Sequence, residues 1–147
     1  MTIIEKEIKL VGSKGEHELV GLFDSGATYS CIDQDLAREL ETIIPLPSPL
    51  SLETAEEGRT VKVKEAVRLD FHLDGYRFSD EFMVIPGSFA SAQDKLSGRL
   101  IIGAATMQKW RFKLDFEADE VIIDPRVTRL RLLWCNGWAA DLVASLY

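Results

Sequence analysis

Hydrophobic and polar residues alternate along much of the chain, which is the pattern of strands with one buried face. Near the start, alternation over residues 2–10 is followed by turn residues at 12–15 and by a second apolar segment at 17–23. The pattern predicts a β-hairpin. Its second strand stops at Asp24-Ser25-Gly26, where strand propensity falls, so Asp24 is expected at a strand end.

Further strands are predicted downstream by the same alternation. Residues 61–73 and 76–85 flank Asp74-Gly75, a strong hairpin turn signal, and residues 114–123 form a last hairpin around Glu117-Ala118-Asp119. The compact apolar run at 100–102 indicates a buried strand. Fold class is therefore predicted to be mostly β.

Short helices are predicted at two places. Asp33 is a good N-cap for a helix over residues 34–41, in which Leu36 and Leu40 would form the buried face. Residues 104–110, directly after the strand at 100–102, have the composition of a second helix. Between them, prolines exclude helix and central strand and predict an extended surface segment; they are Pro45, Pro47 and Pro49.

Composition narrows the class of protein. The chain has 147 residues, 46% of them hydrophobic, which suits one compact domain. Its net charge of -7 opposes binding to nucleic acid. The sequence shows no secretory signal pattern and no apolar run near the roughly 18 residues that span a bilayer, so a cytoplasmic protein is expected. Cys31 and Cys135 are interpreted as packing residues.

Three motifs together resemble the retropepsin-like branch of the aspartic proteases. Asp24-Ser25-Gly26-Ala27-Thr28 matches the catalytic element, and Thr54-Ala55-Glu56-Glu57-Gly58 resembles the flap segment of single-domain members. Ile101-Ile102-Gly103-Ala104 resembles the second element, two hydrophobic residues and a glycine before a helix. The motifs follow in the family's order over about residues 5–125. The resemblance implies a closed retropepsin-like β-barrel with one or two short helices, in a two-fold symmetric homodimer.

The chain divides at residue 128 on this interpretation. Residues 1–128 would form the retropepsin-like domain, and residues 129–147 form an apolar C-terminal extension. Alternation in the first part of the extension suits a strand at a dimer interface, and the spacing of Trp138, Leu142 and Leu146 suits one helical face. Packing within its own chain is the alternative.

A single Asp-Ser-Gly motif has a chemical consequence. Hydrolysing a peptide without a metal or covalent nucleophile needs two carboxylates, one to accept a proton from water and one to give a proton to the carbonyl oxygen. Asp33, Asp35, Asp115 and Asp124 do not repeat the motif, so the second carboxylate must be Asp24 of another copy. The expected function is an aspartic endopeptidase acting on extended polypeptide.

Each residue of the turn has an expected task. Gly26 would give the turn backbone freedom and let another backbone approach closely. Ser25 would hydrogen-bond to the neighbouring copy, and Thr28 would orient the carboxylate or the local backbone. No cofactor and no metal are expected, because His17 and His72 stand alone. A serine-hydrolase mechanism is disfavoured by the absence of a GxSxG elbow.

A second function remains open from the sequence. The flap segment carries Glu53, Glu56, Glu57 and Arg59, unlike the Gly- and Ile-rich flap tips of retroviral proteases. The alternative is therefore a catalytically inactive retropepsin-like domain that serves as a dimerisation or peptide-binding module. The intact Asp24-Ser25-Gly26 favours the enzyme.

Overall fold

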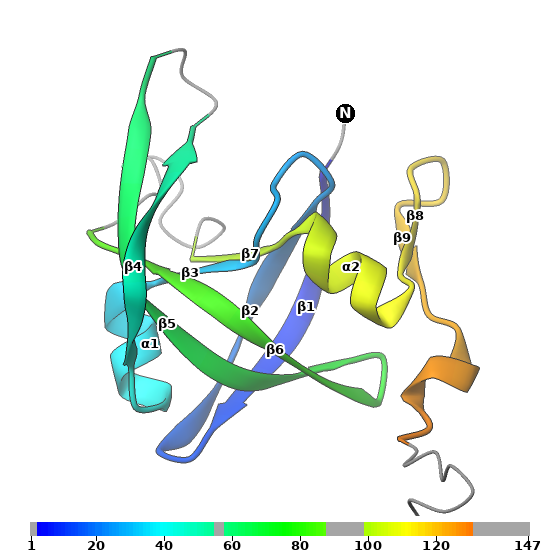
Figure 1. The fold of residues 1–147 in the computed structure, drawn as a ribbon. Helices are drawn as coiled ribbons and strands as arrows, with labels where there is room; N and C mark the ends of the chain where they lie inside the picture. Colours follow the sequence, from blue (N-terminus) through cyan, green and yellow to red (C-terminus); the bar gives the residue numbers. More distant parts are fainter. Residues whose placement is uncertain (1–2, 55–57, 88–98, 131–147) are drawn as a thin grey trace, which may run out of the picture.

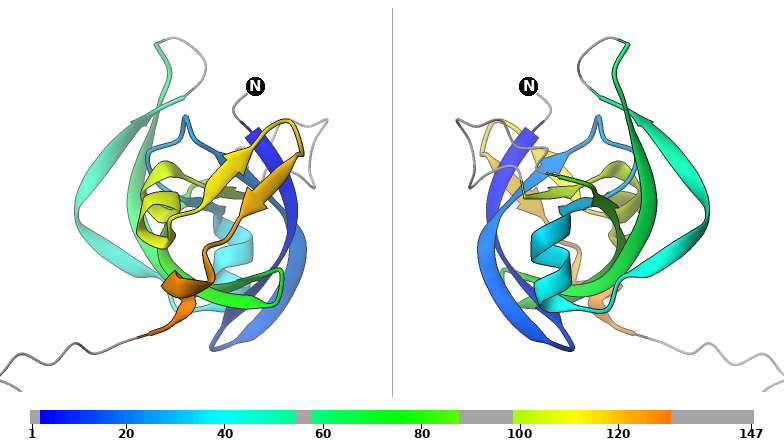
Figure 2. Two further views of the ribbon diagram at one scale, coloured as in Figure 1. Left: turned by 90° about the vertical axis from the view of Figure 1, so that its right-hand side faces the viewer. Right: turned by 90° about the vertical axis from the view of Figure 1, so that its left-hand side faces the viewer.

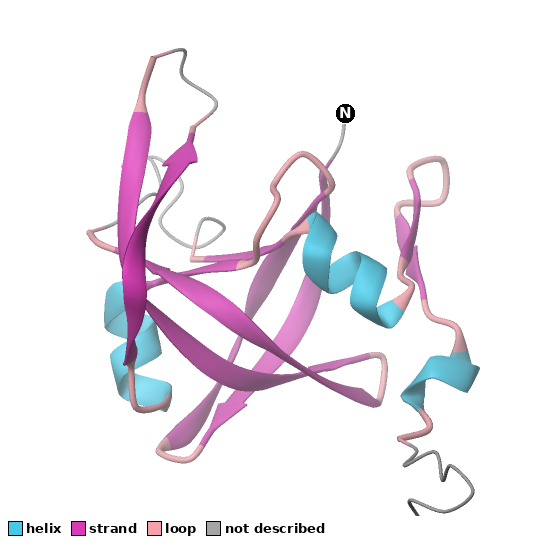
Figure 3. Ribbon diagram, viewed as in Figure 1, coloured by secondary structure: helices cyan, strands magenta, loops and turns pink. Residues whose placement is uncertain are grey.

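The computed structural model describes residues 3–54, 58–87 and 99–130. Strands dominate this part of the chain, which contains two α-helices and one short 3₁₀ helix (Figure 3). The mostly β fold class is confirmed. No helix in the described ranges is both long enough and apolar enough to cross a membrane.

The first hairpin is formed by β1 (Ile3–Gly12) and β2 (Gly15–Asp24). The two strands pair antiparallel in continuous register, from Ile3 opposite Asp24 to Gly12 opposite Gly15. One face is buried, as the alternation predicts, and its fully covered side chains include Ile8, Leu10 and Phe23. Asp24 is the last residue of β2, as expected.

The second hairpin consists of β5 (Thr60–Leu73) and β6 (Tyr76–Ile85). Its two-residue turn has positive φ at both Asp74 (51°) and Gly75 (82°), the backbone of a type I′ turn. The Asp-Gly prediction is confirmed. Across the hairpin the rings of Phe71 and Phe78 pack with their centroids 5.4 Å apart.

Two short strands complete a closed barrel (Figure 1). β7 (Leu100–Ile102) lies between β2, to which it is parallel, and β3 (Cys31–Asp33), to which it is antiparallel. β3 continues the sheet to β6 and β5, and β5 pairs with β1 over three residues. The ring order is β1-β2-β7-β3-β6-β5, so six strands enclose the core.

The proline-rich segment is the outermost strand, β4 (Ile44–Glu53), whose one partner among the described strands is β5. Its register is interrupted between Pro45 and Leu50, and all three prolines are exposed. The chain is extended and lies at an edge because proline cannot donate to a ladder. The expected surface segment is thus an edge strand.

Two α-helices lie on opposite sides of the barrel (Figures 1 and 2). α1 (Gln34–Leu40) is capped by the Asp33 carboxylate, which accepts from the Leu36 N–H at 3.1 Å. α2 (Ala104–Trp110) follows β7 after Gly103 and ends at Arg111, which has a φ of 55°. Both helices match their predictions.

The core has two parts. The larger part fills the barrel, where four phenylalanines are almost fully buried: Phe23, Phe71, Phe78 and Phe82. The smaller part underlies the β4–β5 hairpin and contains Cys31, Val63, Ala66, Met83 and Ile85. Cys31 is a buried packing residue, as interpreted, whereas Cys135 lies outside the described residues.

A small appendage follows α2. It consists of β8 (Lys113–Asp115) and β9 (Glu120–Ile122), which form a separate two-stranded sheet, and of the 3₁₀ helix η1 (Pro125–Thr128). Val121 and Phe112 join the main core from this region. Most of the predicted C-terminal extension, residues 131–147, lies outside the described residues, so its predicted role stays a prediction.

Candidate active site

Residues 24–30, here called the Asp24 loop, connect β2 to β3. The loop turns sharply because the Ala27 N–H donates to the Asp24 carbonyl oxygen at 3.1 Å. The Gly26 N–H donates to Asp24 Oδ1 at 2.9 Å and so fixes the direction of the carboxylate. Among the described residues, no donor contacts Oδ2. Asp24 is half-buried, and Ser25, Gly26 and Thr28 are exposed.

The roles expected for the loop residues are only partly found. The group that orients Asp24 is the Gly26 amide, and no hydrogen bond joins the Thr28 hydroxyl to Asp24 in the described part of the chain. Gly26 does not adopt a positive φ. A Cβ added there would lie 3.2 Å from Asp24 Oδ1, so the carboxylate would have to shift by a few tenths of an ångström. The role of Ser25 between two copies stays a prediction.

The second sequence element supports the Asp24 loop directly. β7 pairs with the end of β2, so that Leu22 lies opposite Ile101 and Phe23 opposite Ile102. At the start of α2, the Ala104 N–H donates to the Ala27 carbonyl at 2.7 Å and the Ala105 N–H to the Thr28 carbonyl at 3.0 Å. The structure thus brings together two of the three motifs.

Gly103 shows why glycine is needed in this element. A Cβ added at Gly103 would lie 2.5 Å from the carbonyl carbon and oxygen of Tyr29 and 3.0 Å from the Ala27 carbonyl oxygen. These neighbours are backbone atoms and cannot move without displacing the Asp24 loop. The close approach of two backbones therefore requires glycine at Gly103.

The third motif lies at the tip of the β4–β5 hairpin. The strands stay paired up to Glu53 and Thr60, and Thr54 bonds to the Arg59 carbonyl through both its amide (3.0 Å) and its hydroxyl (3.1 Å). Gly58 has a positive φ of 77°. Ala55, Glu56 and Glu57 lie outside the described residues. The hairpin and the Asp24 loop project from the same end of the barrel, at the top of Figure 1.

Other carboxylates of the chain are occupied by structural tasks. Asp33 caps α1 and pairs with Arg99 at 3.3 Å. Asp115 accepts two backbone N–H groups in the β8–β9 turn. Asp70 pairs with two arginines, and Asp124 pairs with Arg126, which holds the pKa of the Asp124 carboxyl down at about 2. Asp124 repeats the hydrogen bonds of the Asp24 turn, since its Oδ1 accepts from the Arg126 N–H and its carbonyl oxygen accepts from the Val127 N–H. Its Oδ2 is bound by the Arg126 guanidinium, whereas Asp24 Oδ2 has no donor among the described residues.

Cys31 directly follows the Asp24 loop and is the first residue of β3. Its Sγ lies 3.6 Å from the Tyr29 carbonyl oxygen. Burial raises the pKa of the Cys31 thiol to about 11, so the thiol stays protonated at neutral pH. Because the thiolate is the reactive form, the environment of Cys31 disfavours a cysteine nucleophile.

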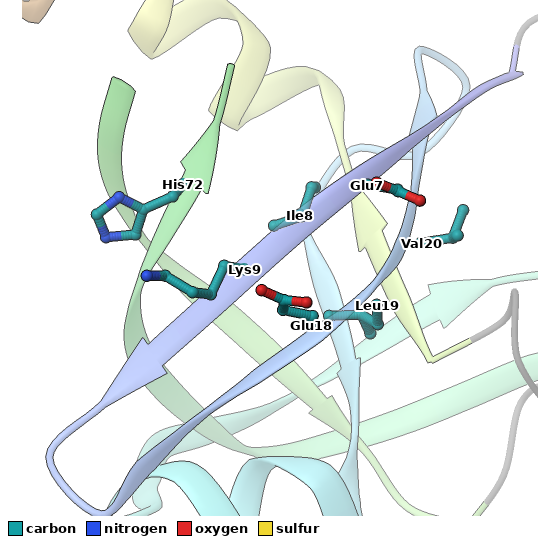
Figure 4. Close-up of a pocket in the computed structure, with 7 residues that line it drawn as sticks. All are labelled: Glu7, Ile8, Lys9, Glu18, Leu19, Val20 and His72. Carbon is teal, nitrogen blue, oxygen red and sulfur yellow. The ribbon is translucent and has the colours of Figure 1, made fainter. Parts of the chain in front are cut away.

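Two open pockets in the described part of the chain do not include Asp24. The larger, about 380 Å³, is lined by residues of β1 and β2 together with His72 of β5 (Figure 4). The second, about 330 Å³, lies around Trp110 and the β5–β6 turn. Among the described residues no group of His, Cys, Asp and Glu is arranged to hold a metal ion.

Sequence reasoning missed one polar cluster behind the Asp24 loop. The Ser30 hydroxyl lies within hydrogen-bond distance of the Thr106 hydroxyl and accepts from the Gly103 N–H at 3.0 Å. In the sequence these residues are a serine and a threonine beside apolar residues. Nothing in the sequence indicates that they form a pair, because 76 positions separate them.

Comparison with known proteins gives a likeness of fold. No family model matches the chain, and no curated protein matches it. Among solved structures, the chain is similar to the retroviral protease-like domain of Ddi1 from Leishmania major, with a TM-score of 0.56 and 16% identity over 84% of this chain and 90% of that chain. At this identity the likeness concerns the fold. The chain therefore has a retropepsin-like fold, a closed six-stranded barrel with two helices.

Proposed function

We propose that the protein is an aspartic endopeptidase whose active site uses Asp24 from each of two copies. The observation that carries the proposal is the position of Asp24 within the retropepsin-like fold. Its carboxylate stands at the end of β2, held by the Gly26 amide through Oδ1, while Oδ2 has no donor among the described residues. This leaves one oxygen for water, substrate or a second carboxylate.

A second copy supplies the missing half of the site. The proposed dimer is two-fold symmetric, with both Asp24 loops at the symmetry axis. Support comes from the single Asp-Ser-Gly motif and from the engagement of Asp33, Asp115 and Asp124 elsewhere. One chain thus offers a single carboxylate of the required type.

The two carboxylates would divide the chemistry between them. Close carboxylates cannot both ionise cheaply, so the pair holds one shared proton. The protonated Asp24 polarises the carbonyl of the scissile peptide bond, and the ionised Asp24 takes a proton from the attacking water. The products are a carboxylic acid and an amine, as in any peptide hydrolysis.

Substrate would lie extended between the Asp24 loops and the β4–β5 hairpin. The loop and the hairpin project from the same end of the barrel (Figure 1), and the main-chain groups of a hairpin can hydrogen-bond to an extended peptide. The smaller core beneath this hairpin is apolar. Main-chain hydrogen bonds do not distinguish one substrate sequence from another, so specificity would depend on contacts with the side chains of the substrate.

Cleavage of a peptide library tests the proposal. The unaltered protein should cleave peptides between pH 4 and 7, a range placed about the reference values of carboxyl groups. Asp24→Asn should abolish cleavage. Asp115→Asn is the matched control, because it removes one carboxylate from a turn outside the Asp24 loop and should leave cleavage intact.

The rival function predicts a different result from the same protein. An inactive dimerisation or peptide-binding module would bind extended peptides without cleaving them, and Asp24→Asn would leave binding unchanged. Cleavage that survives Asp24→Asn would contradict the proposed carboxylate pair.

A further inference from the structure

A buried pair of hydroxyl groups joins the Asp24 loop to α2. Ser30 and Thr106 are 2% and 1% exposed, and their hydroxyls lie within hydrogen-bond distance. The Ser30 hydroxyl also accepts from the Gly103 N–H at 3.0 Å, while the Ser30 carbonyl accepts from the Met83 N–H at 2.9 Å. Ser30 is thereby bonded to the start of α2 and to β6.

The Ser30–Thr106 pair is next to buried residues in the chain. Cys31 follows Ser30, Met107 follows Thr106, and Ile102 precedes Gly103; all three are buried. A buried hydroxyl is tolerated only when it is hydrogen-bonded, so loss of one partner leaves a polar group unsatisfied. Apolar residues of similar size would fill the space without fixing the distance and direction between loop and helix.

We infer that Ser30 and Thr106 are positioning residues for Asp24. The inference rests on the proposed function. The loop carbonyls of Ala27 and Thr28 bind the first N–H groups of α2, and the hydroxyl pair sets how α2 approaches the loop. It thereby sets where Asp24 stands relative to its counterpart in the second copy.

Loss of the hydroxyl pair should lower kcat and should change KM much less. Misplacing a reacting group by 1 Å costs on the order of 100-fold in rate, so even a partial shift of the loop is measurable. Thr106→Val keeps the side-chain shape but removes the hydroxyl. It should lower kcat by about tenfold or more and change KM by less than about threefold.

Thr106→Ser separates hydrogen bonding from packing. It removes a buried methyl group but retains the hydroxyl, so kcat should stay near that of the unaltered protein. Ser30→Ala removes the other partner and also the acceptor of the Gly103 N–H, so it should lower kcat at least as much as Thr106→Val, and it tests the inference if Thr106→Val fails to fold. The double variant Ser30→Ala/Thr106→Val should be about as impaired as Ser30→Ala alone, because the bond between the two hydroxyls is already lost in the single variant.

Two controls distinguish positioning from general loss of stability. Ile8→Val shortens a buried core side chain far from the loop in sequence and lowers stability without touching the hydroxyl pair. Thr128→Val makes the same replacement as Thr106→Val, but at a hydroxyl that bonds to Pro125 in η1. Neither should reduce kcat. An equal loss in Thr106→Val and Thr106→Ser, or in Ile8→Val, would overturn the inference.

Amide hydrogen exchange tests the inference without relying on activity. The N–H groups of Ala104 and Ala105 hold the loop carbonyls, so in Thr106→Val they should exchange about tenfold faster, and in Thr106→Ser at the original rate. Unchanged exchange in Thr106→Val would refute the positioning role. Absence of cleavage by the unaltered protein would instead refute the proposed function, and the exchange result would still decide whether the hydroxyls hold the loop.

Discussion

At the scale of single residues, the direction of the Asp24 carboxylate is set by backbone groups. The Gly26 amide holds Oδ1, and the N–H groups of Ala104 and Ala105 hold the loop that follows. Such contacts do not depend on which side chains the loop carries, provided that the backbones can approach closely. The glycine at Gly103 permits that approach.

Gly103→Ala should therefore destabilise the protein and impair the site. The added Cβ would meet the Tyr29 carbonyl at 2.5 Å, and forcing backbone apart costs about 1–3 kcal/mol of unfolding free energy. Gly15→Ala is the matched control, since an added Cβ there meets nothing within 4 Å. Urea unfolding of both variants measures the difference. Equal stability of the two would contradict the close approach.

Glu41 gives a prediction about acid stability. Its carboxylate accepts from the Ser13 hydroxyl and from the Ser13 and Thr42 amides, which lower the Glu41 pKa from 4.5 to about 2. A lowered folded-state pKa stabilises the protein above the unfolded value, and this contribution is lost as pH falls from 4.5 towards 2. Glu41→Gln should be less stable than the unaltered protein at neutral pH.

The difference between the two proteins should shrink as pH falls through that window. Unfolding midpoints measured at several pH values between 2 and 7 provide the check. A difference that does not vary with pH would show that Glu41 does not act through its charge. Glu39→Gln serves as the control, because Glu39 lies on the neighbouring helix surface and makes no ion pair among the described residues.

The sequence identified residues better than it identified their partners. Asp24 and the Ile101–Ala104 element were recognised from local motifs, whose letters lie next to one another. Ser30 and Thr106 were not recognised, because their contact depends on the pairing of β7 with β2 and β3. No local pattern encodes such a pairing.

At the scale of elements, most strands and both helices could be predicted because each carries its own signal. Asp74-Gly75 specified its turn, and Asp33 specified the start of α1. What could not be predicted is the sheet order, in which β7 enters between β2 and β3. A three-residue apolar run has no feature that indicates which strands it will pair with.

The edge strand β4 yields a prediction about association. The three prolines lack N–H groups, so the outer edge offers fewer donors to a strand from another molecule. Replacing Pro47 and Pro49 by Thr should increase concentration-dependent association, measured by light scattering. Pro125→Thr, in η1, is the control and should have no such effect. Unchanged association in the β4 variant would exclude a protective role for these prolines.

At the scale of the whole molecule, the proposed two-fold site makes activity depend on pH through the pair of carboxylates. One shared proton is required, so the rate should be greatest below neutral pH and should fall as pH rises and the proton is lost. The pH dependence of kcat/KM measures this. A rate that stays flat or climbs into the alkaline range would exclude the shared-proton mechanism.

The C-terminal extension gives a prediction about assembly. Leu130, at the end of the described chain, is 82% exposed, and residues 131–147 are rich in apolar side chains. We propose that residues 129–147 contribute to the dimer, since apolar surface of this kind is normally covered. Deleting residues 130–147 should shift the light-scattering mass towards the monomer. An unchanged dimer would assign the extension to its own chain.

The arrangement of β7 also has a consequence for the timing of biosynthesis. Asp24 is made early, but the strand and helix that hold its loop are residues 100–110. On the ribosome, contacts so distant in sequence form only after the later residues have emerged. A nascent chain thus carries Asp24 in an unformed turn until residues 100–110 have emerged, and on the proposed function it would have no active site before then.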